Sequence, residues 1–229
     1  MSFADKVVLI TGKSLTLGYD YARYLLENDA KVALCDINNF ERCRSVVNEY
    51  ASVFGDRRVV ALQCNGTDQN QLKNVFESCI RHFQKIDIIV NSACAFDAWM
   101  GDEDNTISDT NFECVVRGII LALQYMGVPL GGQGGTVVQI VSKPNEDAMI
   151  PEYLSLRRNV SAYTKAIAKS NEGNPTYRSI KFMTLCTDSL PDNVGRNFVH
   201  ILEEGKTGDC WVSENGGLPT LEPNYQWMR

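Results

Sequence analysis

The feature that most constrains this chain is a regular alternation of short apolar runs with segments of helical periodicity. Continuous apolar runs of this length are typical of parallel strands that are covered on both faces. Strands are expected at 6–11, 31–36, 58–64, 86–91, 136–142, 180–186 and 210–212. Helices are expected at 19–28, 40–54, 69–83, 109–126, 151–170 and 192–204. This order predicts right-handed βαβ units and an α/β fold, a doubly wound parallel sheet with helices on both faces.

The whole chain, residues 1–229, is expected to form a single domain. A length of 229 residues fits one large domain, and no repeat, linker or low-complexity segment interrupts the alternation. In open parallel sheets the ligand lies at the carboxyl ends of the strands, near the point where the strand order reverses. Functional residues are therefore expected in the turns that follow the strands.

Composition excludes several classes of partner. Lys plus Arg is 22 and Asp plus Glu is 28, so the net charge is −6, which argues against binding to nucleic acid or to an anionic membrane. No apolar run reaches the roughly 18–20 residues that cross a bilayer, and the chain enters a strand without a signal peptide, so we expect a cytoplasmic location. The eight cysteines have no CxxC pairing and are expected to be reduced, and no metal site is expected.

The turn after the first predicted strand suggests a binding site for a dinucleotide. It reads TGKSLTLG from Thr11 to Gly18, and glycines such as Gly12 and Gly18 let a helix N-terminus approach a pyrophosphate. Asp36 ends the second strand, where a carboxylate can accept the ribose hydroxyls of an adenosine and repel a 2′-phosphate. A buried turn with a capping aspartate explains the same residues, so both interpretations stay open.

Over nearly its whole length the chain resembles the short-chain dehydrogenase/reductase family, most closely the branch that contains 15-hydroxyprostaglandin dehydrogenase and the insect alcohol dehydrogenases. The resemblance rests on VVLITGKSLTLGYDYARYLL, KVALCDIN, IDIIVNSAC, TNFECVVRGIILALQYM, GGTVVQIVS and PEYLSLRRNVSAYTKAIA. It implies a Rossmann-type fold, NAD as cofactor, and an oxidoreductase that acts on a small alcohol or ketone.

The resemblance also implies which residues contact the cofactor. These are Gly12, Thr16, Leu17, Gly18, Asp36, Asn65, Asn91 and Ala93. Three positions depart from the family pattern: Thr16 replaces the middle glycine of the turn, Asn65 replaces an acid, and Cys94 replaces a glycine. A β-branched residue such as Thr16 disfavours a positive φ and carries a Cβ toward the cofactor, so we expect weakened binding of NAD.

The catalytic set implied by the resemblance is altered as well. It comprises Tyr153 as acid/base, Arg157 in place of a lysine, Ser142, and Asn111 as anchor of a water relay. Residues at i and i+4 share a helix face, so the Arg157 cation can lower the pKa of the Tyr153 phenol from its usual value of about 10. A guanidinium stays protonated, however, and cannot pass on a proton as an ammonium can.

Two further differences concern the serine and the substrate lid. The serine position of the family falls at Lys143 or Pro144, so Ser142 reaches the site only if the end of the strand is bent. After the sixth strand, residues 184–191 run almost directly into the next helix, so the substrate-covering segment of the family is expected to be missing. Hydride transfer benefits from a closed, dry pocket, and an open groove lacks this protection.

Three interpretations remain open from the sequence. The chain is a working NAD-dependent oxidoreductase, or a non-catalytic binding, storage or structural protein with the same fold, or a truncated isoform of an active enzyme. Truncation explains the missing lid but not Thr16, Cys94 or Arg157, and the altered motifs together favour weak or lost catalysis. The helices at 109–126 and 151–170 could form a homodimer, although core packing explains most of their apolar residues.

Overall fold

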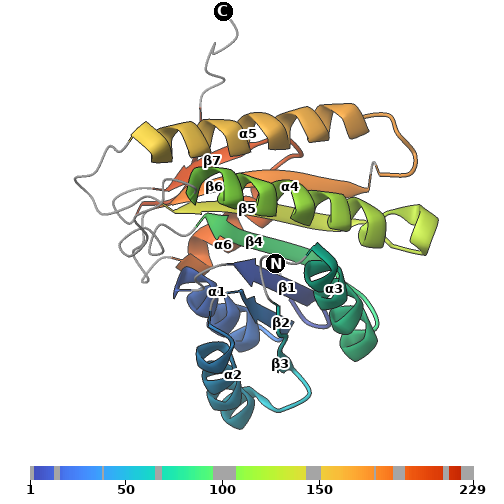
Figure 1. Ribbon diagram of the computed structural model, residues 1–229, viewed down its shortest axis with the longest axis vertical. Coiled ribbons are helices and arrows are strands. Elements are labelled where there is room, and N and C mark those ends of the chain that lie inside the picture. Colours follow the sequence, from blue (N-terminus) through green and yellow to red (C-terminus); the bar gives the residue numbers. More distant parts are fainter. Residues whose placement is uncertain are drawn as a thin grey trace, which may run out of the picture.

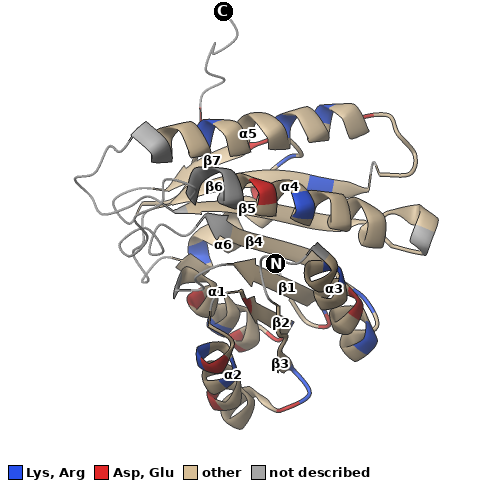
Figure 2. Ribbon diagram, viewed as in Figure 1, with Lys and Arg blue, Asp and Glu red and all other residues tan. Residues whose placement is uncertain are grey.

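The computed structural model describes most of the chain. The described residues are 3–12, 16–37, 39–64, 69–94, 107–142, 151–177, 179–187, 194–213 and 217–222. In these ranges, no helix is long and apolar enough to cross a membrane. Figure 2 shows both basic and acidic residues on the helices at 40–54 and 69–83.

The strands form one eight-stranded sheet. They are β1 (Val7–Gly12), β2 (Lys31–Asp36), β3 (Val59–Ala61), β4 (Ile88–Cys94), β5 (Gly135–Ser142), β6 (Ile180–Thr187), β7 (Cys210–Ser213) and β8 (Thr220–Leu221). Their order across the sheet is β3-β2-β1-β4-β5-β6-β7-β8, with β8 antiparallel and all other pairs parallel. The doubly wound sheet predicted from the sequence is confirmed.

Helices cover both faces of this sheet. They are α1 (Thr16–Glu27), α2 (Phe40–Phe54), α3 (Gln69–Phe83), α4 (Ile107–Met126), α5 (Pro151–Asn171) and α6 (Val194–Glu204), with a short 3₁₀ helix at Val128–Leu130. Figure 1 shows α4 and α5 side by side on one face of the sheet, with α4 over β4 and β5 and α5 over β5 and β6. The helices α3, α4 and α5 share one core with the sheet, and α1, α2 and α6 share the other.

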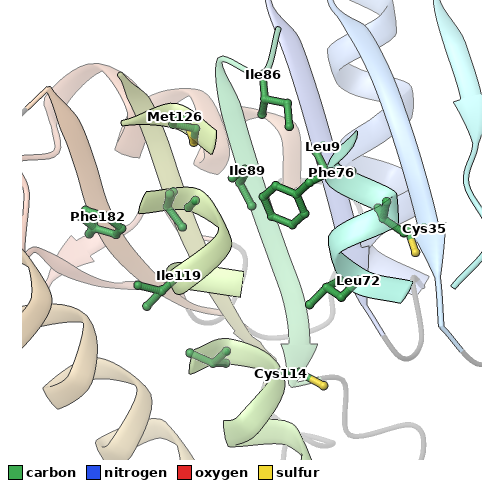
Figure 3. Packing of buried hydrophobic residues seen from close by; sticks show 14 of the residues in the cluster. Leu9, Cys35, Leu72, Phe76, Ile86, Ile89, Cys114, Ile119, Met126 and Phe182 are labelled. Atoms are coloured by element: carbon green, nitrogen blue, oxygen red, sulfur yellow. The ribbon is translucent and has the colours of Figure 1, made fainter. Parts of the chain in front are cut away.

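Alternate residues of each strand enter the two cores. Val7 and Leu9 face α3 and α4, whereas Val8 and Ile10 face α1, and all four are fully buried. Figure 3 shows Leu9 and Ile89 of the strands packed near Phe76 of α3. Full burial of each such side chain contributes about 1.5–3 kcal/mol, so the apolar runs of the sequence account for the two-sided sheet.

The structure corrects several predicted boundaries. The third strand is shorter than 58–64 because it is the edge strand and pairs only with β2, from Val59 to Ala61. The fourth begins later than 86 and continues to Cys94, through a change of register between Asn91 and Cys94. Strand β8 is too short to give a periodic pattern and was not predicted. The seven cysteines whose side chains the structure describes are all buried.

Candidate functional site

The predicted cofactor turn lies where the strand order reverses. Strand β1 lies between β2 and β4, and Gly12 is in register with Asp36 on one side and with Ser92 on the other. The backbone N–H of Ile37 donates to the carbonyl of Gly12 at 2.8 Å, which closes the end of β1 against β2. The fold therefore brings Gly12 and Asp36 together at the place where sheets of this type hold ligands.

Asp36 is buried, with 3% of its surface exposed. Its Oδ1 accepts a hydrogen bond from the backbone N–H of Asn39 at 2.9 Å. Its Oδ2 accepts one from the hydroxyl of Tyr19 at 3.0 Å. Both oxygens of the carboxylate therefore already have a donor from the protein, in addition to being covered from solvent.

Tyr19 lies in the first turn of α1, directly after Gly18, and is itself buried at 6% exposure. The Arg42 guanidinium lies 5.4 Å from the centroid of the Tyr19 ring, and the Tyr50 hydroxyl donates to the Tyr19 carbonyl at 3.1 Å. Burial, followed by the charge of Asp36, raises the pKa of the Tyr19 phenol above its usual value. The hydroxyl consequently remains protonated and keeps its role as donor to Asp36.

Two other residues that were predicted to contact the cofactor, Asn91 and Leu17, make contacts within the fold. The Asn91 amide is buried and donates to the carbonyl of Cys114 on α4 at 3.4 Å, and its Oδ1 lies 3.5 Å from the Thr11 hydroxyl. A Cβ at Gly118 of α4 would overlap that amide, so only glycine allows this close approach. Leu17 points into the core shared with α1.

On the catalytic side, the Arg157 guanidinium is paired with a carboxylate. Its Nη2 lies 2.6 Å from Oε1 of Glu222, and the two side chains are 19% and 16% exposed. The Cys210 thiol donates to Oε2 of Glu222 at 2.9 Å, and Ser161 of α5 lies 3.3 Å from the same sulfur. A hydrogen bond to Cys186, then burial, raises the pKa of Cys210, so its thiol remains a donor.

The backbone also fixes Glu222 in this position. Its N–H donates to the carbonyl of Cys210 at 2.8 Å, directly after β8 has paired with β7. The Arg157 charge therefore lies opposite a negative charge that is held by both backbone and side-chain contacts. Because Arg157 is one turn from Tyr153 on α5, this carboxylate offsets the positive field on which the catalytic prediction depends.

Several predicted residues have only their backbone described. Thr16, Ala93, Asn111, Ser142 and Tyr153 lie in α1, β4, α4, β5 and α5, and their side chains lie outside the description. Asn65, Lys143, Pro144 and residues 188–193 lie outside the described residues altogether. The helices that carry Asn111 and Tyr153 are packed together, with the rings of Phe112 and Tyr163 5.7 Å apart at 75°.

Three residues of this region were not found from the sequence. Gly118 carried a signal, since a glycine inside a helical pattern usually marks a close packing contact. No sequence pattern indicated the role of Tyr19, apart from its place directly after the glycine turn. Glu222 is 65 residues away from Arg157 along the chain, so no local pattern could connect the two.

Comparisons with known proteins agree with this geometry. The model of the short chain dehydrogenase family matches residues 6–186. The chain belongs to the short-chain dehydrogenase family. Human 15-hydroxyprostaglandin dehydrogenase [NAD(+)] is 31% identical over 174 residues, which are 73% of this chain and 62% of that protein. The chain thus matches less than two thirds of the length of this relative.

Two further comparisons lie within the same family. The alcohol dehydrogenase-related 31 kDa protein of Drosophila mauritiana is 22% identical over 193 residues, which are 69% of this chain and 68% of that protein. A short chain dehydrogenase from Mycobacterium avium has a TM-score of 0.78 at 16% identity and covers 98% of this chain and 87% of its own. At this identity the structural likeness supports the fold alone.

The family implies NAD, and the described residues do not fit it as they are arranged. Two ribose hydroxyls need an accessible carboxylate at the end of β2. Asp36 has the right chemistry and position, but it is 3% exposed and is bonded to Tyr19 and Asn39. The acid is therefore present, and a neighbouring group would have to move before a dinucleotide could use it.

Proposed function

We propose that this member of the short-chain dehydrogenase family has weak or lost dehydrogenase turnover and serves mainly as a non-catalytic protein that retains the fold. The observation that carries the proposal is the ion pair between Arg157 and Glu222. A cation one turn from Tyr153 would favour the phenolate by its field, and a paired cation does so much less.

The replacement of the family lysine supports the proposal from a second direction. A guanidinium holds its proton, so even an unpaired Arg157 would not complete a proton relay. Each general acid–base group typically contributes about 10²–10⁴-fold to a rate, although such losses do not simply multiply. Impairment of the lysine and serine roles together is enough to remove several orders of magnitude.

The test is formation of NADH by the wild-type protein with NAD in large excess over protein and a broad panel of primary and secondary alcohols. Human 15-hydroxyprostaglandin dehydrogenase, assayed in parallel with its own substrate, controls for the assay. We expect kcat below about 10⁻² per second with every alcohol. Turnover of about 1 per second or more with any of them would refute the proposal.

A second candidate is a slow NAD-dependent oxidoreductase of a small alcohol or ketone. It is favoured by Asp36, which stands at the end of β2 in register with Gly12, and by relatives whose names specify NAD(+). Tyr153 would then act as acid/base, with Asn111 and Ser142 in supporting roles. Residual turnover that disappears in Tyr153→Phe would support this candidate, and residual turnover that survives the substitution would exclude it.

Other predictions about this protein remain proposals. We propose a cytoplasmic location, no nucleic acid or membrane partner, and a homodimer through α4 and α5. The exposed apolar side chain of Ile120 on α4 is compatible with such a dimer. Light scattering of the purified protein measures the oligomeric state directly.

A further inference from the structure

The contact between Tyr19 and Asp36 has a direct consequence for ligand binding. The two side chains come from the first turn of α1 and the last residue of β2, the two elements that flank the predicted dinucleotide turn. Their hydrogen bond joins a phenol O–H to a carboxylate oxygen at 3.0 Å. A ribose hydroxyl is a donor of the same kind, and because Asp36 is only 3% exposed, its Oδ2 has no open side for a second hydroxyl while Tyr19 is bonded to it.

We infer that Tyr19 occupies the ribose acceptor of this chain, so that a dinucleotide has to displace its hydroxyl from Asp36 before it can bind. The inference rests on the proposal that the Asp36 site is where this chain would meet NAD. On this inference Tyr19 is a second cause, besides the altered glycine turn, of the weakened NAD binding that we expect.

The surroundings of Tyr19 indicate that the contact is stable. The Arg42 guanidinium faces the ring, Tyr50 bonds to the Tyr19 backbone, and the side chain is almost completely buried. A cation facing an aromatic ring is attracted to it, and the attraction is stronger where water is excluded. Displacement of the hydroxyl therefore has to overcome more than one hydrogen bond.

An alternative is that Tyr19 orients Asp36 for the ribose and assists binding. The burial of Asp36 argues against it, because a carboxylate that a tyrosine only held in place would still leave part of its surface exposed for the ribose. The two alternatives predict opposite effects when the hydroxyl is removed. Loss of a competitor strengthens the binding of NAD, and loss of a support weakens it.

The experiment is a calorimetric titration of NAD into the full chain, compared between wild type and Tyr19→Phe. A hydrogen bond to a charged group contributes about 1.5–3 kcal/mol, so the variant should bind NAD at least about tenfold more tightly. Tyr24→Phe is the matched control, because Tyr24 lies on the same helix and faces Gly195 of α6. Its affinity should equal that of wild type.

Equal or weaker binding by Tyr19→Phe, or no binding by any variant up to about 10 mM NAD, would overturn the inference. Tyr19→Leu also lacks the hydroxyl and is measured in parallel, so that a folding defect of one variant does not decide the result. The outcome is independent of turnover. Wild-type activity would refute the proposed function without changing the affinity ratio, and an inactive Tyr19→Phe that binds NAD tightly would support both.

Discussion

Asp36 at the end of β2 and Arg157 on α5 are the charged residues of the predicted cofactor side and catalytic side of the site, and they have different kinds of partner. At the end of β2, Asp36 is bonded to a neutral hydroxyl from Tyr19, only 17 residues away. On α5, Arg157 is paired with the opposite charge of Glu222, which comes from the segment after β8. A substrate or cofactor hydroxyl can replace another hydroxyl, but it cannot replace a carboxylate as partner of a cation.

This difference predicts that the two proposed losses, of NAD binding and of catalysis, are not equally reversible. For Asp36 to accept a ribose, only the Tyr19 hydroxyl has to be removed, because the charge and position of the carboxylate are intact. For catalysis, Arg157 has to be replaced by a lysine, and the Glu222 carboxylate has to be removed as well. A single substitution should therefore restore much of the cofactor binding, and no single substitution should restore catalysis.

The largest expected effect is a gain of turnover in a combined variant. In a Tyr19→Phe background, Arg157→Lys, Lys143→Ser and Glu222→Gln together supply an ammonium that no longer faces the Glu222 carboxylate, and the family serine. We expect NADH formation from a secondary alcohol to rise at least about 100-fold above the Tyr19→Phe background. Without Glu222→Gln, the new lysine remains paired and the gain should be much smaller.

The control for this gain is Arg158→Lys in the same background, since Arg158 is the exposed neighbour of Arg157. It should leave the rate unchanged. If Arg157→Lys alone gave the full gain in the rate of NADH formation, Glu222 would not contribute to the low activity. The difference proposed between Asp36 and Arg157 would then be wrong.

The next effect is on stability. Glu222→Gln removes the carboxylate that pairs with the largely buried Arg157 guanidinium, and we expect the free energy of unfolding to fall by about 2–4 kcal/mol in urea. Glu27→Gln breaks the exposed pair of Glu27 with Arg23 and should cost less than about 0.5 kcal/mol. Equal small losses in both variants would show that the Arg157 pair is no stronger than a surface pair.

The smallest effect concerns the choice of cofactor. In Tyr19→Phe, the freed Asp36 carboxylate should repel a 2′-phosphate, so NAD should bind at least about tenfold more tightly than NADP. Adding Asp36→Ala should reduce this preference to near unity. Titration of both cofactors into both proteins measures it, and tighter binding of NADP to Tyr19→Phe would exclude Asp36 from the ribose site.

The fold was predictable because the determining signals are local. The apolar run at Lys31–Asp36 and the periodicity at Gln69–Phe83 coincide with β2 and α3 at both ends. The strand β8 escaped prediction because it has two residues and depends on its pairing with β7. The single helical turn at Val128–Leu130, which ends at Gly131 with φ of 80°, is likewise too short for a periodic signal.

The site was only partly predictable from the sequence. Gly12 and Asp36 could be placed because they end neighbouring strands, and Asn91 because it lies near the end of the next strand, β4. Their partners could not, because a hydroxyl from Tyr19 or an amide contact to Cys114 depends on how the helices pack on the sheet. The partner of Arg157 depends on the path of the chain after β7, which no spacing in the sequence encodes.

The central claim is that the charged groups of this site are satisfied within the fold, so that the wild-type protein does not hold NAD. The most direct test is a calorimetric titration of NAD into the wild-type full chain. The account predicts no saturable binding up to about 1 mM, which corresponds to a binding free energy weaker than about −4 kcal/mol. Saturable 1:1 binding with Kd of about 10 µM or tighter would contradict it.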